Sequence, residues 1–280
     1  MTKHSVNSMS LFVQHDVFGS NLLRLKEKQR IARNFSRAAK KYDASARLQN
    51  NVALHLMLYL PEKAGTIVDL GCGTGKWTHA LSVKYQHAKV TGIDFSMGML
   101  TEAKSRCYKN VQWCSGGIEA LPFPNESFDL AFSNLAVQWC QLSNVLSDVG
   151  RVLKPGGYFV CATLAAGSLA EMRTLWLNID QQPHANDYDT PEQQIKICNH
   201  SSLKVENAHH QQVTLYYTSV TELLREFKSV GINTVINASM TTGLTHPSKF
   251  QRFITAYEGL RQQKGIPCTY QVLYLVLAKK

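Results

Sequence analysis

The residues best suited to chemistry form a glycine-rich loop at 69–75, with the sequence DLGCGTG. The loop ends a β-branched, apolar run at 66–71 that is typical of a buried strand, and a helical segment follows it. Glycine lets a ligand approach the main chain, and the amino end of the helix offers free N–H groups with a partial positive charge. The loop therefore predicts a binding site for a ligand with an anionic end.

An acidic residue follows at a suitable distance along the chain. Asp94 ends the next apolar run, at 89–94, where a carboxylate can accept hydrogen bonds from the two hydroxyls of a ribose. An alternative role for Asp94 is to cap the helix that begins at Ser96.

The spacing of the glycines discriminates between nucleotide cofactors. Dinucleotide sites prefer G-x-G-x-x-G, in which the third glycine packs the helix against the strand. Here Gly75 comes one residue early, and Lys76 occupies the place of that third glycine. We therefore expect S-adenosylmethionine, with the carboxylate of its methionine half at the helix end. The predicted cofactor-binding residues of these segments are Asp69, Gly71, Gly73, Gly75, Asp94 and Phe95.

The elements that must position these residues alternate between strand and helix. This alternation predicts an α/β, Rossmann-like domain with a mostly parallel, seven-stranded sheet and helices on both faces. The expected strands lie at 66–71, 89–94, 111–114, 128–133, 158–163, 212–217 and 270–278. The expected helices lie at 76–85, 97–106, 145–153, 168–181, 220–230 and 247–263.

The domain plan is one domain with additions. We expect a flexible extension at 1–25 and a single domain at 26–280. The first segment, 26–64, is predicted to be a helical cap, because Ile31, Phe35, Ala38 and Tyr42 fall on one helix face and Pro61 ends a second helix. Within the rest, we expect a cofactor-binding core at 65–165, a lid at 166–210 whose residues 182–208 are polar and irregular, and completion of the sheet by 211–280.

Composition limits the partners. The formal net charge is +10, and cations crowd the stretch from Arg24 to Arg47, which is either a solvated helix face or a docking surface for an acidic partner. The seven cysteines form no C-x-x-C pair, so neither a disulfide framework nor a metal site is expected. No apolar run approaches the length of a membrane span, and the chain's start lacks the features of a secretory signal. We expect a cytoplasmic protein, a monomer, with no membrane or nucleic-acid partner.

Further segments resemble class I methyltransferases. Residues 116–123 (GGIEALPF) are similar to the adenine loop of that superfamily, 128–134 (FDLAFSN) to its fourth strand, and 151–157 (RVLKPGG) to its turn into the fifth strand. The resemblance implies that Gly117, Ile118 and Asn134 also bind the cofactor. One departure is Gly117 itself, where the superfamily usually carries an acid for the adenine amino group.

A narrower resemblance covers nearly the whole chain from about Asn34. The chain resembles the malonyl-acyl-carrier-protein O-methyltransferases of biotin synthesis at 35–43 (FSRAAKKYD), 133–140 (SNLAVQWC), 183–186 (PHAN) and 265–270 (GIPCTY). That family transfers a methyl group to the free carboxylate of a malonyl thioester, held on an acyl carrier protein or coenzyme A. A carboxylate is already ionised at pH 7, so such a site needs no strong base.

The resemblance also implies roles for individual residues. Tyr42 matches the entry-segment tyrosine of that family and is the expected catalytic residue, because its hydroxyl could orient the substrate carboxylate or cover the cofactor, although its place on the helix face also suits a core residue. Substrate-binding roles are implied for Gln138 and Trp139, for His184 in the lid, and for a cation, with Arg37, Arg173 and Arg261 as candidates. Alternatives left open are a methyltransferase for another small molecule such as a quinone, an RNA methyltransferase, and a non-catalytic binding module.

Overall fold

A seven-stranded sheet forms the centre of the computed structural model, which describes residues 7–180, 184–231 and 246–280. Its strand order is β3-β2-β1-β4-β5-β7-β6. Strands β1 to β5 pair in parallel, and β7 runs antiparallel to both of its neighbours. The predicted mostly parallel, seven-stranded sheet is confirmed. The strands are β1 (Thr66–Leu70), β2 (Lys89–Asp94), β3 (Val111–Ser115), β4 (Phe128–Asn134), β5 (Leu153–Leu164), β6 (Leu203–Tyr217) and β7 (Ile266–Lys279).

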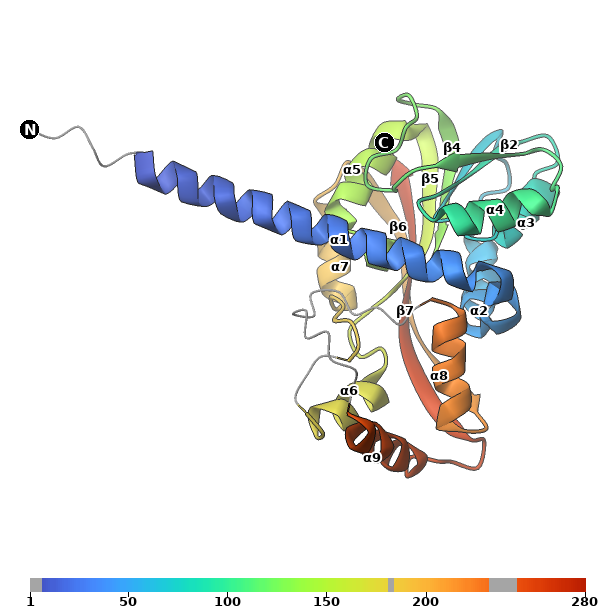
Figure 1. The fold of residues 1–280 in the computed structure, drawn as a ribbon. Helices are drawn as coiled ribbons and strands as arrows, with labels where there is room; N and C mark the ends of the chain where they lie inside the picture. Colours follow the sequence, from blue (N-terminus) through green and yellow to red (C-terminus); the bar gives the residue numbers. More distant parts are fainter. Residues whose placement is uncertain (1–6, 181–183, 232–245) are drawn as a thin grey trace, which may run out of the picture.

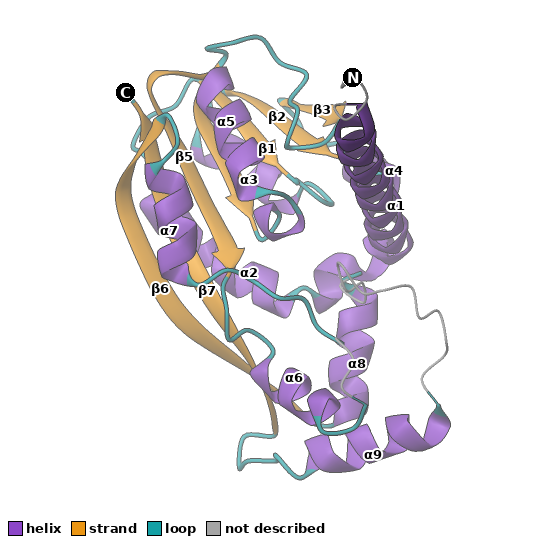
Figure 2. Cartoon of the chain, turned by 90° about the vertical axis from the view of Figure 1, so that its left-hand side faces the viewer, coloured by secondary structure: helices purple, strands orange, loops and turns teal. Residues whose placement is uncertain are grey.

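Helices cover both faces of this sheet (Figures 1 and 2). Neighbouring residues of one strand belong to different apolar clusters: Ile67 packs with Leu81 on one face, whereas Val68 packs with Val145 on the other. This alternation follows from the pleat, and it explains why the central strands are apolar throughout. The α-helices are α1 (Asn7–Ser45), α2 (Arg47–Leu56), α3 (Lys76–Lys84), α4 (Met97–Ser105), α5 (Leu142–Val152), α6 (Ala170–Leu177), α7 (Pro191–Asn199), α8 (Val220–Ser229) and α9 (Pro247–Glu258).

The antiparallel pair β6 and β7 is longer than the parallel strands and extends past them to the region where α6, α8 and α9 gather (Figures 1 and 2). The prediction of an irregular segment at 182–208 was wrong from Pro191 onward, while 184–190 contain neither helix nor strand and residues 182 and 183 lie outside the described residues. Thr190 and Gln193 form a capping box with Pro191 in the first turn, so α7 begins there, and β6 begins at Leu203. The first part of β6 was not predicted to be a strand because its residues are polar. They are polar because β6 is an edge strand whose middle is exposed. A lid role for 166–210 stays a prediction.

Helix α1 lies across the molecule rather than within its layers. It begins at Asn7, within the predicted flexible extension and earlier than the predicted helical cap at 26–64, and residues 1–6 of that extension lie outside the described residues. Its first half projects away from the body, and its second half packs beside α4 (Figure 1). Ile31 and Ala38 of the predicted helix face are buried. None of the described helices is long and apolar enough to cross a membrane.

Candidate active site

The glycine loop lies where β1 ends, and two neighbouring segments determine its shape. Gly71, Gly73 and Gly75 have φ angles of +74°, +55° and +77°. A Cβ atom on Gly71 would lie 2.4 Å from the Cβ atom of Ala136, so the segment after β4 packs directly on the loop. A Cβ atom on Gly73 would meet nothing within 4 Å. Gly71 is thus required by packing, whereas Gly73 leaves open space beside the main chain.

Trp113 of β3 explains the third glycine. A Cβ atom on Gly75 would come within 2.2 Å of the Trp113 ring, and one on Gly92 within 2.7 Å of it. The indole therefore lies against the loop and against β2, and both glycines make room for it. Gly75 was predicted to bind the cofactor, whereas Trp113 carries no signal in the sequence, since contact between β3 and the loop is a tertiary feature.

Asp94 lies at the end of β2, and its carboxylate accepts a hydrogen bond from the glycine loop. One carboxylate oxygen accepts the Gly73 N–H at 2.9 Å, and the other accepts the Ser96 N–H at 2.8 Å. Burial raises the pKa of Asp94 to about 6, although hydrogen bonds from Ser96, Gly73 and Phe95 oppose that rise. Ser96 itself caps α4 by accepting the Met99 N–H. Asp94 is therefore largely ionised at neutral pH, and each oxygen retains capacity to accept from a ligand hydroxyl.

Two adjoining cavities surround the loop and share Tyr42, Gly71, Gly73 and Asn134. The first, here called the loop end, is also lined by Asp43 of α1, Asp69 of β1, Asn50 of α2, and Lys76 and Trp77 of α3. The second, here called the Asp94 end, is also lined by Asp94, Phe95, Met99, Gly117, Ile118, Glu119, Leu135, Ala136, Trp139 and Cys140, and by Lys28, Ile31 and Phe35 of α1. The arrangement is an elongated site with a junction beside Tyr42 and Asn134.

Asp69 is the buried acid of the loop end. It accepts a hydrogen bond from the Thr78 hydroxyl at 2.6 Å. Burial raises the pKa of Asp69 to about 7, while the Thr78 bond lowers it. Asp69 therefore connects the strand end to α3 and places a carboxyl group at the wall of the cavity.

Helix α1 forms the outer wall of the site through contacts far apart in the sequence. Lys28 forms an ion pair with Glu119, which also accepts the Gln141 N–H at 2.8 Å. Further along the helix, the hydroxyls of Ser36 and Ser96 lie 2.9 Å apart. The basic composition of 24–47 signalled this helix, but nothing in the sequence pattern paired Lys28 with Glu119.

Tyr42 of α1 lies at the junction of the two ends. Burial, together with the nearby carboxylates of Asp94 and Asp43, raises the pKa of Tyr42 above its usual range. The phenol therefore stays protonated at neutral pH. It can donate a hydrogen bond to an anion in the site, but it cannot act as a base.

Comparisons with known proteins agree with this geometry. A family model described as a methyltransferase domain matches residues 67–157. A malonyl-[acyl-carrier protein] O-methyltransferase from Marinomonas sp. (strain MWYL1) is 32% identical over 256 residues, which cover 90% of this chain and 94% of the relative. One from Dechloromonas aromatica (strain RCB) is 33% identical over 253 residues, covering 90% and 95%.

The chain belongs to the malonyl-[acyl-carrier protein] O-methyltransferase family. The biotin biosynthesis bifunctional protein BioHC of Cellvibrio japonicus (strain Ueda107) is 34% identical over 268 residues, and the chain spans about half (52%) of its length. The YcgJ protein from Bacillus subtilis has the same fold, with a TM-score of 0.59, 18% identity and coverage of 82% of this chain and 98% of that one. The expected methyltransferase fold is confirmed, and S-adenosylmethionine is the cofactor to be expected of this family.

The cofactor residues predicted for this family member come together at the site. Its two ends are lined by Asp69, Gly71, Gly73, Asp94, Phe95, Gly117, Ile118 and Asn134. Gly75 lines neither end and instead packs against Trp113. A Cβ atom on Gly117 would meet nothing within 4 Å, so the place of the missing family acid is open space. The side-chain amide nitrogen of Asn134 donates to the Gln49 carbonyl at 3.0 Å, while its buried Oδ1 atom has no partner among the described residues.

The substrate residues implied by the resemblance are dispersed. Trp139 lines the Asp94 end, with its ring edge-on to Phe35 at 5.7 Å between centroids. Gln138 is not among the lining residues: its amide nitrogen donates to the Leu135 carbonyl at 2.7 Å, and its buried Oε1 atom has no partner among the described residues.

Arg37 is exposed on α1 and lines neither cavity. His184, Arg173 and Arg261 have structural partners away from the described walls of the site. Arg173 donates to the Asn186 carbonyl at 2.9 Å and pairs with Asp187. His184 stacks on Trp176 at 3.8 Å and lies 3.0 Å from Asp180. Arg261 donates to the Thr218 carbonyl at 3.0 Å and pairs with Glu258. Their substrate roles stay predictions.

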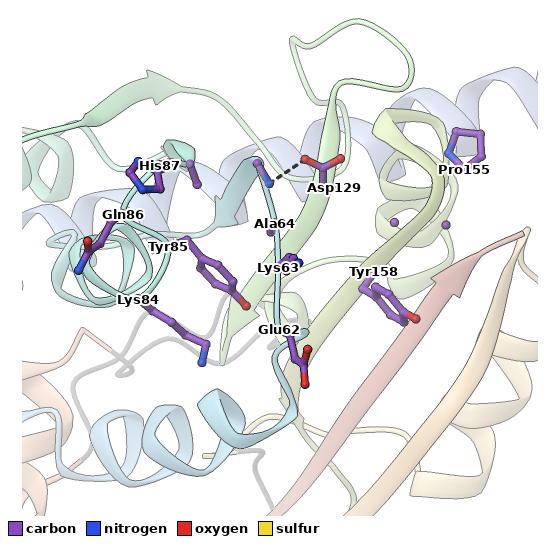
Figure 3. Close-up of a pocket in the computed structure, with 14 residues that line it drawn as sticks. Glu62, Lys63, Ala64, Lys84, Tyr85, Gln86, His87, Asp129, Pro155 and Tyr158 are labelled. Atoms are coloured by element: carbon purple, nitrogen blue, oxygen red, sulfur yellow. Dashed lines mark hydrogen bonds between the residues drawn. The ribbon is translucent and has the colours of Figure 1, made fainter.

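A larger cavity of about 830 Å³ lies away from the site, at the amino ends of β1 and β4 (Figure 3). Asp129, which lines it, accepts hydrogen bonds from the N–H groups of Gly65 at 3.0 Å and Thr66 at 2.7 Å and from Lys154 at 3.0 Å. These bonds join β1, β4 and β5, so Asp129 serves the sheet. No residue of the predicted site lines this cavity.

Proposed function

We propose that this protein binds S-adenosylmethionine along the elongated site and transfers its methyl group to the free carboxylate of a malonyl thioester on an acyl carrier protein. The observation that carries the proposal is the position of Tyr42, a protonated donor at the junction of the two ends. Family membership supports this acceptor class, because the relatives are named for malonyl carrier protein.

The residues present fit this cofactor. At the Asp94 end, the carboxylate of Asp94 can accept from ribose hydroxyls, and the open space at Gly117 suits the adenine ring. At the loop end, the main chain at Gly73 is open to a ligand. The buried Oδ1 atom of Asn134 has no partner among the described residues, so it can accept a hydrogen bond from the cofactor. When bound, the cofactor supplies a methyl group activated by its sulfonium.

The chain's own residues then have a positioning task. A malonyl carboxylate is ionised at neutral pH, so no proton has to be removed before methyl transfer. Tyr42 donates a hydrogen bond that orients this carboxylate toward the junction, where reacting atoms must approach to about 3–3.5 Å. Helix α1 and Trp139 close the outer side of the site and exclude water. The product is the methyl ester of the malonyl thioester.

The outer face of α1 supports an acidic carrier as the partner. Lys26, Arg33, Arg37, Lys40 and Lys41 are exposed, and within the described residues none of them forms an ion pair. Asp43 turns away from this face toward Thr74 and Arg106. Unpaired cations on the helix that walls the site favour the approach of an acidic protein, and this attraction is screened by salt.

The experiment that tests the proposal is a methyl-transfer assay with labelled S-adenosylmethionine. Malonyl carrier protein, malonyl-coenzyme A and acetyl carrier protein are offered in parallel. We expect base-labile methyl incorporation on the malonyl substrates and none on the acetyl carrier protein, since the acetyl group lacks a free carboxylate. Cofactor binding without incorporation on any malonyl substrate would contradict the proposed acceptor and point to another small molecule.

A further inference from the structure

The loop end of the site contains a cation that neither the glycine pattern nor the family resemblance assigns. Lys76 is the first residue of α3, directly after the glycine loop, and its side chain lines this cavity. Among the described residues that line the loop end, Lys76 is the only one that is positively charged. The other cation of the site, Lys28, lies at the Asp94 end and is paired with Glu119.

The partners of Lys76 leave its charge available. Its Nζ atom donates to the side-chain oxygen of Asn50 at 2.8 Å and lies 5.5 Å from the centre of the Trp77 ring. Both contacts orient the ammonium group, but neither neutralises it, because an amide and an indole carry no net charge. Lys76 is therefore held in place from α2 and keeps two donor positions for a ligand.

The acids of the loop end are engaged with other groups. Asp43 accepts from Thr74 and pairs with Arg106, and Asp69 accepts from Thr78. Two buried acceptors at this end have no hydrogen-bond partner among the described residues, Asp43 Oδ2 and Asn134 Oδ1, and of these Asp43 is already in an ion pair with Arg106. The cavity thus offers an available cation and an available acceptor, the two groups that an α-amino acid needs for its carboxylate and its ammonium.

We propose that Lys76 binds the α-carboxylate of the methionine half of S-adenosylmethionine. Asn50 is then a positioning residue, which orients the ammonium group of Lys76 through the hydrogen bond between them. The inference rests on the proposed function, because it assumes that cofactor in this site. It adds a charge-assisted contact to the N–H groups at the start of α3, and it makes Lys76 a determinant of specificity for cofactors that carry the carboxylate.

The test compares two ligands that differ only in that group. Binding of S-adenosylmethionine and of decarboxylated S-adenosylmethionine is measured by calorimetry for the wild-type chain and for Lys76→Met. We expect the variant to bind S-adenosylmethionine about tenfold more weakly, the scale of one charge-assisted contact at a partly exposed site. Its affinity for the decarboxylated ligand should stay within about twofold, since that ligand has nothing for Lys76 to bind.

Two further variants sharpen the result. Lys84→Met removes a lysine from the other end of the same helix, beside the larger cavity, and should change neither affinity. Asn50→Asp gives Lys76 an acidic partner and adds a negative charge, so it should weaken S-adenosylmethionine binding while leaving or improving binding of the decarboxylated ligand.

The outcomes are separable. An equal loss of both ligands in Lys76→Met, or no loss of either, would overturn the role of Lys76. If the folded wild-type chain binds neither ligand, the proposed function itself fails, whatever the variants do. If both ligands bind the wild type, and Lys76→Met loses selectivity for the carboxylate while Lys84→Met keeps it, the inference stands.

Discussion

Asp43 and Thr74 join α1 to the glycine loop: the Thr74 hydroxyl donates to the Asp43 carboxylate at 2.8 Å. The same carboxylate pairs with Arg106 at the end of α4. Because Asp43 follows Tyr42 directly in the chain, these contacts fix the place of Tyr42 over the site.

Replacing Asp43 by Ala removes the acceptor of the Thr74 hydroxyl and the partner of Arg106, so it should separate α1 from the glycine loop. We expect the free energy of unfolding to fall by about 1–3 kcal/mol, the usual contribution of hydrogen bonds to a charged group, and kcat to fall because Tyr42 is no longer held over the site. Thr74→Ser keeps the hydroxyl and is the matched control, with kcat near the wild-type value. Denaturant titration and the methyl-transfer assay measure the two effects, and a kcat equal to that of the control would contradict the positioning role.

Tyr42→Phe keeps the ring and removes the donor. We expect kcat to fall by about 100-fold, since one oriented donor in a water-excluded site contributes on that scale. Binding of S-adenosylhomocysteine, measured by calorimetry, should change little because the ring still packs near Phe35. A variant with wild-type turnover would show that Tyr42 is a packing residue.

Gly75 and Gly73 of the loop should respond differently to alanine. In Gly75→Ala the new Cβ atom meets Trp113, so we expect the free energy of unfolding to fall by about 2–3 kcal/mol, and Gly75→Ala/Trp113→Leu should recover part of that loss. Gly73→Ala meets open space, so it should lose less stability and more cofactor affinity. Thermal unfolding and calorimetry distinguish the two. Loss of stability equal in both single variants would argue against the packing role of Trp113.

Cofactor affinity should depend on pH through Asp94. Burial raises the pKa of this carboxyl group to about 6. Since protonation removes an acceptor for the ribose, we expect affinity for S-adenosylhomocysteine to fall as the pH drops through 6 toward 5. Asp94→Asn should bind weakly and show no such transition. A wild-type affinity that is flat between pH 5 and 8 would contradict the role of Asp94.

The outer face of α1 should control recognition of the carrier. Arg33→Glu/Lys41→Glu is expected to raise KM for malonyl carrier protein about tenfold at low salt and to leave KM for malonyl-coenzyme A unchanged. Lys84→Glu/Lys89→Glu carries the same change in charge near the amino ends of the strands and should affect neither substrate. If both pairs of variants behave alike, net charge rather than this face determines the effect.

Local patterns predicted the parallel part of the fold and the cofactor half of the site. A buried parallel strand is an apolar run, and a loop that must pass close to Ala136 and Trp113 needs glycine, so β1, the loop and Asp94 could be identified without coordinates. The same reasoning missed α7 and most of β6, because the exposed side chains of an edge strand carry no apolar alternation.

What only the tertiary structure decided is which distant residues meet. The sequence by itself determined that 24–47 is basic and that Tyr42 lies on the face of a helix with Ile31. It could not show that this helix walls the cofactor site, since the ion pair of Lys28 with Glu119 and the bond of Asp43 with Thr74 join segments with no pattern in common. Nor could it separate Lys76, which faces the site, from Arg173, which holds Asn186 and Asp187, because a cation's role depends on the partners that folding places around it.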